Sequence, residues 1–125
     1  MTCFDTSIVI SILQGNDRVS NFINSVKGNE IVITSVTEYE LLKHFSNKKQ
    51  ESALNDFLSS VRTLSFDKRS SVEAAKIYKD LKSKGALINE NDILILAICI
   101  TNGEELITED RYFERLERID IKIIK

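Results

Sequence analysis

Four acidic side chains of this sequence lie just beyond short apolar runs, or in the first turns of the helical patterns that follow such runs. They are Asp5, Glu40, Asp92 and Asp110. The carboxyl ends of neighbouring parallel strands meet at one edge of a sheet, so residues at these places converge if the runs form such a sheet. The spacing therefore makes the four carboxylates candidates for one site.

A group of carboxylates at one place favours a divalent cation. Like charges at close range raise one another's pKa and lose hydration, which is destabilising without compensation. Oxygen ligands without histidine or cysteine suit Mg²⁺ or Mn²⁺, which also bind the phosphate oxygens of a substrate. Such a site can polarise a phosphate and deprotonate an attacking water. The pattern thus predicts metal-assisted hydrolysis of a phosphodiester.

Each of these acids also has an ordinary structural interpretation. Aspartate at a helix start is favoured as an N-cap or by the helix dipole, which applies to all three aspartates. Glu38 fits a capping box with Ser35, whereas Glu40 lies on a different face of the same helix and has no capping duty. Three neighbouring hydroxyls have two equally plausible roles. They can cap helices or form turns, or they can position the metal ligands or water by hydrogen bonds. They are Thr6, Ser7 and Thr108.

The elements that would position these side chains alternate along the chain. Short apolar runs typical of strands occur at 2–4, 31–34, 62–65, 105–108 and 120–124. Helical patterns occur near 6–14, 17–27, 35–46, 51–60, 69–84 and 89–102. Strands that alternate with helices imply right-handed crossovers and a parallel sheet covered on both faces, which is an α/β fold. The 125 residues fit a single domain, 1–125.

Two of the helical patterns depend on their flanking residues. The helix near 69–84 can be capped by Ser70 or Ser71. The run at 93–100 is apolar throughout and by itself equally fits a buried strand. An asparagine before this run and a glycine after it are helix start and stop signals, so we predict a buried helix.

The composition is that of a globular protein, and it indicates the cellular compartment in which the protein occurs. Hydrophobic residues make up 42% and charged residues 29% of the chain, as in a soluble domain with its own core. Cys3 and Cys99 lie in apolar runs without metal-binding or redox spacing, so we expect both to be reduced core residues. The N-terminal residues do not form a signal-peptide pattern, and no apolar run is long enough to span a bilayer. We expect a cytoplasmic protein.

The net charge of −2 argues, taken alone, against binding of nucleic acid through bulk positive charge. The charge is unevenly distributed, however: residues 1–40 carry −3, residues 41–84 carry +5 and residues 85–125 carry −4. A basic middle segment can attract RNA, because phosphate contacts supply most nucleic-acid affinity. Most surface lysines only form solvated faces. The candidate RNA-binding residues are Arg111, Lys43, Lys76 and Lys79.

Four short segments surround the candidate acids. They are Phe4-Asp5-Thr6-Ser7, Thr34 to Leu41, Glu90 to Ala97 and Ile107 to Phe113. In order and spacing they resemble the motifs of the PIN-domain ribonucleases, and more narrowly those of VapC-type toxins from prokaryotic toxin–antitoxin pairs. No single motif is specific, but the four together extend over essentially the whole chain.

The resemblance implies a three-layer α/β/α fold with five parallel strands in the order 3-2-1-4-5, and an acidic pocket that cuts RNA with Mg²⁺ or Mn²⁺. It implies four catalytic acids, Asp5, Glu40, Asp92 and Asp110. Asp5 and Asp92 are the expected metal ligands, and Glu90 is a further candidate ligand together with the other two acids.

The family also implies two protein partners, a second copy in a homodimer and a VapB-like antitoxin that covers the groove. Four apolar residues are candidates for such an interface, and the same spacing fits an internal core. They are Phe45, Leu54, Phe57 and Leu58.

Two other interpretations remain open. A phosphoaspartyl protein, either a receiver domain or a dehalogenase-like phosphatase, has a similar size and fold. Position 7 lacks the acid that such a phosphatase carries two residues after its aspartate, and no lysine is well placed late in the chain. The other is a catalytically inactive PIN-like module that only binds a partner, and the presence of all four acids disfavours it.

Overall fold

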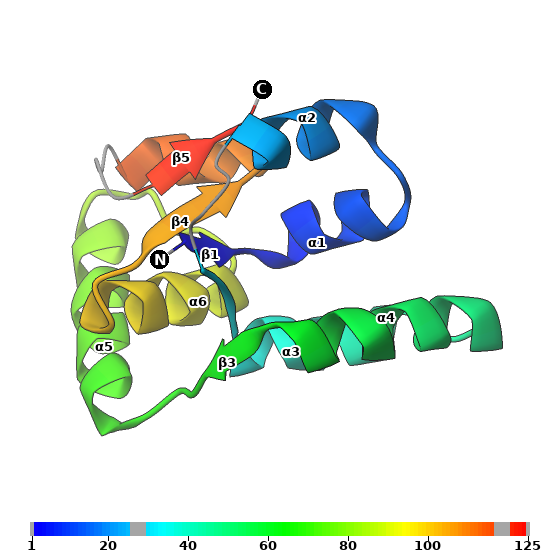
Figure 1. Ribbon diagram of the computed structural model, residues 1–125. Helices are drawn as coiled ribbons and strands as arrows, with labels where there is room; N and C mark the ends of the chain where they lie inside the picture. Colours follow the sequence, from blue (N-terminus) through cyan, green and yellow to red (C-terminus); the bar gives the residue numbers. More distant parts are fainter. Residues whose placement is uncertain (1, 26–29, 117–120, 125) are drawn as a thin grey trace.

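Five strands form one parallel sheet at the centre of the fold (Figure 1). The structure is a computed structural model that describes residues 2–25, 30–116 and 121–124. The strands are β1 (Thr2–Phe4), β2 (Ile31–Thr34), β3 (Arg62–Leu64), β4 (Glu105–Thr108) and β5 (Ile121–Ile123). They pair in the order β3-β2-β1-β4-β5. The α/β class and the strand order implied by the family resemblance are thereby confirmed.

Helices connect the strands and cover the sheet (Figure 1). They are α1 (Thr6–Leu13), α2 (Asp17–Ser25), α3 (Ser35–His44), α4 (Lys48–Ser60), α5 (Lys68–Ser83) and α6 (Glu90–Thr101), with a 3₁₀ helix, η1 (Arg111–Leu116). The ends of two expected elements, residues 26–27 and residue 120, lie outside the described residues.

Each side of the sheet has its own core, because consecutive strand residues point to opposite faces. In β1, Cys3 packs into the core that α5 and α6 cover, and Phe4 packs into the core that α1 to α4 cover. Leu106 and Ile107 of β4 are divided between the two cores in the same way. Burial on both faces explains why the strands appear in the sequence as continuous apolar runs.

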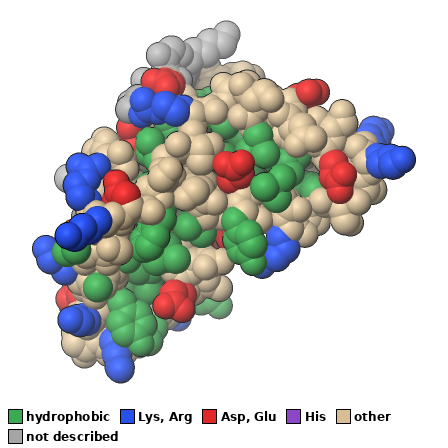
Figure 2. Space-filling view, turned by 90° about the horizontal axis from the view of Figure 1, so that it is seen from below, with side chains coloured by type: hydrophobic (Ala, Val, Ile, Leu, Met, Phe, Trp, Pro, Cys, Tyr) green, Lys and Arg blue, Asp and Glu red, His purple; other side chains and the backbone are tan. Residues whose placement is uncertain are grey.

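The four apolar residues considered for an interface belong to the core on the α1 to α4 side. Phe45 and Leu54 are buried, and Phe57 and Leu58 are partly buried against the same core. Their spacing therefore serves internal packing. Figure 2 shows a face on which apolar side chains gather among charged ones. The large apolar side chains that are exposed include Tyr39, Leu42, Phe66, Val72, Tyr78, Leu87 and Tyr112.

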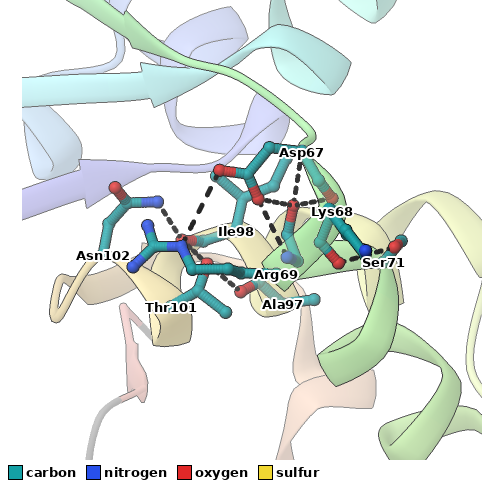
Figure 3. A network of polar contacts seen from close by, with 9 residues as sticks. Asp67, Lys68, Arg69, Ser71, Ala97, Ile98, Thr101 and Asn102 are labelled. Atoms are coloured by element: carbon teal, nitrogen blue, oxygen red, sulfur yellow. Dashed lines mark hydrogen bonds and ion pairs between the residues drawn. The ribbon is translucent and has the colours of Figure 1, made fainter.

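A capping box starts α5 (Figure 3). Asp67 Oδ1 accepts a hydrogen bond from Ser70 N at 2.9 Å, and Ser70 Oγ accepts one from Asp67 N at 2.7 Å. The prediction of Ser70 or Ser71 as the N-cap was wrong, because the chain is still extended at Asp67 and becomes helical directly after it. Ser70 serves instead as the third helical residue of the box.

The N-cap of α3 also differs from the sequence expectation. Thr34, the extended last residue of β2, accepts a hydrogen bond at Oγ1 from Thr37 N at 3.1 Å. Ser35 is already helical, and its Oγ accepts from Phe66 N at 3.2 Å. The predicted capping box of Ser35 with Glu38 is therefore wrong by one residue.

The apolar run at 93–100 is a buried helix, as its flanking residues predicted. Asn89 caps the start of α6 by accepting a hydrogen bond from a backbone N–H of the first turn at 2.9 Å. At the other end, the side chains of Thr101 and Asn102 donate to the carbonyl of Ile98 at 3.2 and 2.8 Å (Figure 3). This helix brings its first turn to the edge of the sheet where β1 and β4 end.

Cys3 and Cys99 are free, buried and part of the same core, which confirms them as core residues. Within the described ranges, none of the helices combines the length and apolarity needed to cross a bilayer.

Asp67→Ala is expected to lower the free energy of unfolding by about 1 kcal/mol, because it removes the carboxylate that accepts the hydrogen bond from Ser70 N. Urea denaturation at neutral pH measures this loss. Ser71→Ala is the matched control, since the exposed Ser71 hydroxyl only donates to the carbonyl of Lys68. An equal loss in both variants would contradict the importance of the box.

Candidate active site

Asp5 stands at the end of β1, where it also caps α1. Its Oδ1 accepts hydrogen bonds from Ile8 N at 3.1 Å and from Ser7 Oγ at 2.7 Å, and its Oδ2 accepts one from Thr108 Oγ1. Only 3% of Asp5 is exposed to solvent. Both oxygens of this carboxylate are therefore held in one orientation.

Thr108 joins Asp5 to Asp110 across the two neighbouring strands β1 and β4. Its hydroxyl is buried at the end of β4, donates to Asp5 and accepts from Asp110 N at 2.9 Å. Asp110 Oδ1 in turn accepts from Tyr112 N at 2.9 Å and so begins η1. Because β1 and β4 are parallel and adjacent, their ends bring both aspartates to one edge of the sheet.

Glu40 reaches the same edge from α3. Its Oε1 accepts a hydrogen bond from Thr6 Oγ1 at 2.6 Å, and its Oε2 accepts one from Asn91 Nδ2 at 3.4 Å. These bonds connect α3 with the first turns of α1 and α6. Both donors are neutral, so they orient the carboxylate without cancelling its charge.

Asp92 completes the group from the first turn of α6. The pKa of its carboxyl rises from 3.8 to about 7, mainly because burial disfavours the charged form. The negative charges of Asp110, Asp5 and Glu40 raise the pKa further, as does a hydrogen bond with Asp110. The other three carboxylates therefore lie close enough to Asp92 for their charges to disfavour its ionisation.

Burial also raises the pKa of Asp5, from 3.8 to about 6. Hydrogen bonds from Thr108, Ser7 and Ile8 stabilise the charged form and limit the rise, whereas the charge of Asp110 adds to it. Full ionisation of this pocket therefore costs free energy, and a bound cation would offset that cost.

The donor set fits a Mg²⁺ or Mn²⁺ ion that is held partly through water. In the part of the chain that the structure describes, no three acidic, histidine or cysteine side chains are arranged to hold a metal ion by themselves. Mg²⁺ is usually bound by one or two carboxylates and keeps several waters, so an enclosing cage is not required. Asp5, Asp92 and Asp110 offer only oxygen donors and share a charge conflict that a divalent cation relieves.

The other residues named from the sequence line a groove or lie on the exposed surface. Glu90 and Lys79 line a groove of about 260 Å³ between α5 and α6. Lys43 Nζ lies 5.1 Å from the centroid of an exposed tyrosine ring. Lys76 and Arg111 are exposed. The structure thus gathers the four acids with the three hydroxyls and leaves the four basic residues on the surface.

Two polar residues that sequence reasoning missed support the site. Asn91 donates to Glu40, which lies 51 positions earlier in the chain. Glu109 accepts hydrogen bonds from Ser11 Oγ and from Arg18 NH2, the latter at 2.7 Å across 91 positions. Glu109 thereby ties α1 and α2 to the end of β4. Each adjoins a candidate acid, which is the only sequence signal that singles it out.

A cavity of about 430 Å³ lies beside Asp92 and Asp110. Its other walls come from the segment before α6 and from η1, and are Leu87, Ile88, Asn89, Tyr112 and Arg115. This volume is in the range of small-ligand pockets, which are about 300–1,000 Å³. Space for a ligand is therefore directly connected to the carboxylates.

A family model described as PIN domain matches residues 2–119 of the chain. Ribonuclease VapC1 of Methanocaldococcus jannaschii is 33% identical over 92 residues, which cover 73% of this chain and 68% of the relative. Ribonuclease VapC2 of Rickettsia felis is 25% identical over 124 residues, which cover 92% of this chain and 91% of the relative.

Solved structures with the same fold include two toxin–antitoxin complexes. VapBC2 from Rickettsia felis, bound to a DNA fragment from its promoter, has a TM-score of 0.81 at 23% identity and covers 98% of this chain and 96% of its own. A complex from Klebsiella pneumoniae has a TM-score of 0.84 at 18% identity, with coverage of 100% and 98%. At these identities the similarity shows the fold.

The raised pKa of Asp92 predicts a pH-dependent stability of the metal-free protein. The unfolded chain has the ordinary carboxyl pKa, so between about pH 4 and pH 7 the folded protein binds more protons than the unfolded chain. Raising the pH through this range therefore lowers the free energy of unfolding. Asp92→Asn mimics the protonated side chain and is expected to remove the part of this loss that Asp92 causes, while the part that Asp5 causes remains.

The expected gain of Asp92→Asn at pH 8 is on the order of 1–2 kcal/mol, because Asp92 is partly exposed and solvent screens its charge. At about pH 4 the gain is expected to vanish. Urea unfolding in EDTA at both pH values measures it, with Asp80→Asn, an exposed carboxylate paired with Lys84 at 3.0 Å, as the control. Equal stability of wild type and Asp92→Asn at pH 8 would contradict the charge conflict.

Proposed function

Because this chain belongs to the PIN domain family, we propose that it is a VapC-type ribonuclease, the toxin of a toxin–antitoxin pair, which hydrolyses RNA phosphodiester bonds with Mg²⁺ or Mn²⁺. The observation that carries the proposal is the convergence of four carboxylates from separate elements on one edge of the sheet, where three of them disfavour ionisation of the fourth, Asp92. The proposed catalytic acids are Asp5, Glu40, Asp92 and Asp110. We propose that this activity takes place in the cytoplasm.

Asp5 and Asp92 are the proposed metal ligands, and Glu40 and Asp110 complete the acidic wall around them. A bound divalent cation would polarise the scissile phosphate and lower the pKa of the attacking water. Glu90 lines the groove between α5 and α6, so we assign it no part in metal binding.

The hydroxyls around the acids act as positioning groups in this proposal. Thr108 and Ser7 hold Asp5, and Thr6 holds Glu40 together with Asn91. Because these bonds exist before a substrate arrives, the carboxylates need little rearrangement during the reaction.

The geometry at Asp5 disfavours a phosphoaspartyl mechanism. A carboxylate nucleophile needs an oxygen that a phosphate can reach, whereas Asp5 is nearly completely buried and both its oxygens accept hydrogen bonds. As a proposed metal ligand, Asp5 needs only one free lone pair for a small cation, and its Oδ2 accepts a single hydrogen bond.

We expect three kinds of partner. RNA is the proposed substrate, and Arg111, exposed beside Asp110, is the preferred basic contact for its phosphates. A VapB-like antitoxin is the expected protein partner, since the similar solved structures are toxin–antitoxin complexes. A homodimer is proposed because large apolar side chains, among them Tyr39 and Leu42, are exposed and such patches mark interaction surfaces.

Purified wild-type protein is expected to cut single-stranded RNA with Mg²⁺ or Mn²⁺ and to stop when EDTA removes the metal. Asp5→Asn and Asp92→Asn are each expected to lower the rate by more than about 100-fold. This exceeds the effect of removing a residue that only hydrogen-bonds to a metal ligand. Gel assays with matched protein preparations measure the rates. Asp80→Asn, on the exposed face of α5, is the control. Equal cleavage by all four proteins would indicate a contaminating nuclease.

Thr108→Val keeps the shape of the side chain but removes the hydrogen bond to Asp5. We expect about 10–100-fold slower cleavage. Loss of that bond also raises the pKa of Asp5, so the rate should rise with pH only at higher pH values than in the wild type. Thr101→Val, at the far end of α6, is the matched control. A lower rate with an unshifted pH profile would mean that Thr108 has only a structural role.

A further inference from the structure

The cavity beside Asp92 and Asp110 has walls suited to a flat ring. We infer that it binds an unstacked base of single-stranded RNA next to the scissile phosphate, with the ring of Tyr112 as the stacking surface and Arg115 as the cationic wall. This inference rests on the proposed ribonuclease function, because it assigns a subsite for the substrate of that site.

Tyr112 presents an exposed aromatic ring from a backbone that is anchored next to Asp110. The residue is 61% exposed, whereas its neighbour Phe113 is 1% exposed and anchors η1 in the core. The N–H of Tyr112 donates to Asp110 Oδ1 at 2.9 Å. An exposed ring on an anchored backbone can accept a base at little entropic cost, and base–aromatic stacking tolerates any base.

Arg115 forms the cationic wall of the cavity. Its guanidinium carbon lies 5.1 Å from the centroid of the Tyr112 ring, and its NH1 donates to the carbonyl of Leu87 at 3.0 Å. The hydrogen bond ties η1 to the segment before α6 and so connects two walls of the cavity. Bases stack on guanidinium planes as well as on aromatic rings.

The charges around the cavity favour a neutral ring over an anion. Of the described residues that line it, Asp92 and Asp110 are acidic and Arg115 is basic. A phosphate inside the cavity would face two carboxylates, whereas an uncharged base meets apolar contacts from Leu87 and Ile88. The phosphate attached to such a base would then lie toward the carboxylates, where a bound cation would receive it.

The inferred subsite selects unpaired RNA. A base in an A-form helix is paired and stacked on its neighbours, so it can enter the cavity only after it is pulled out. Loops and single-stranded ends present such a base without that cost.

The test compares three single-stranded RNA substrates once the cut bond has been mapped. One is intact, and each of the other two carries an abasic ribonucleotide in place of one of the two residues that flank the cut. Wild-type protein is expected to cleave one of the abasic substrates about 10-fold or more slowly, a factor typical of one stacked base. Tyr112→Leu is expected to cleave the intact substrate as slowly as the abasic one, whereas Tyr112→Phe keeps the wild-type preference.

Tyr78→Leu is the matched control, since Tyr78 is also exposed and its ring lies 5.9 Å from Lys82 Nζ, but it lines the groove between α5 and α6. This variant is expected to keep both rates. Equal urea stability of the Tyr112 variants and the wild type shows that the fold is intact.

If Tyr112→Leu prefers the intact substrate over the abasic one as strongly as the wild type does, the subsite is overturned and the ribonuclease proposal stands. If the wild type cuts no RNA, the ribonuclease proposal fails, and binding of a 2′-O-methyl trinucleotide that contains 2-aminopurine decides the subsite. Quenching of its fluorescence by wild type and Tyr112→Phe, but not by Tyr112→Leu, supports base stacking. Equal signals from wild type and Tyr112→Leu would overturn it.

Discussion

The buried carboxylate of Asp5 is the point on which the fold and the proposed chemistry both depend. It caps α1, lies at the end of a central strand and binds the hydroxyl of Thr108 on the neighbouring strand. Burial opposes its charge and raises its pKa, whereas three hydrogen bonds oppose that rise. The capping role and the ligand role of Asp5 are therefore compatible, because the bonds that begin the helix also set the direction of the carboxylate.

Two of the remaining acids reach the edge of the sheet from helices that pack on opposite sides of it. Glu40 comes from α3, whose buried residues pack into the core of α1 to α4, and Asp92 comes from α6 in the other core. The spacing between these carboxylates thus depends on how the helices on both faces pack against the sheet. Their repulsion is a cost that the folded protein carries, and ligands that bind only the folded state offset such a cost through linkage.

An acidic protein can bind RNA without bulk positive charge when recognition is divided among different interactions. At the site, the carboxylates and a bound cation would hold the phosphate, and in the inferred subsite the ring of Tyr112 and the guanidinium of Arg115 would hold a neutral base. The net charge of −2 therefore says little about nucleic acid, since it averages an acidic edge with a basic middle segment.

Local pattern was enough to locate the strands, because burial on both faces of the sheet leaves continuous apolar runs in the sequence. It also located the helices and predicted that the four acids would lie at one edge of the sheet. The strand order came from the family resemblance. Local pattern failed at the starts of α3 and α5, where the cap depends on which single residue stays extended, Thr34 or Asp67. It also missed Asn91 beside Glu40, since the partner lies 51 positions away. The amino-acid sequence alone determined the types of the functional residues and their alternation with apolar segments. The tertiary structure decided the hydrogen-bond partners of these residues, their pKa values and the shape of the cavity, because all three arise from groups distant in the chain.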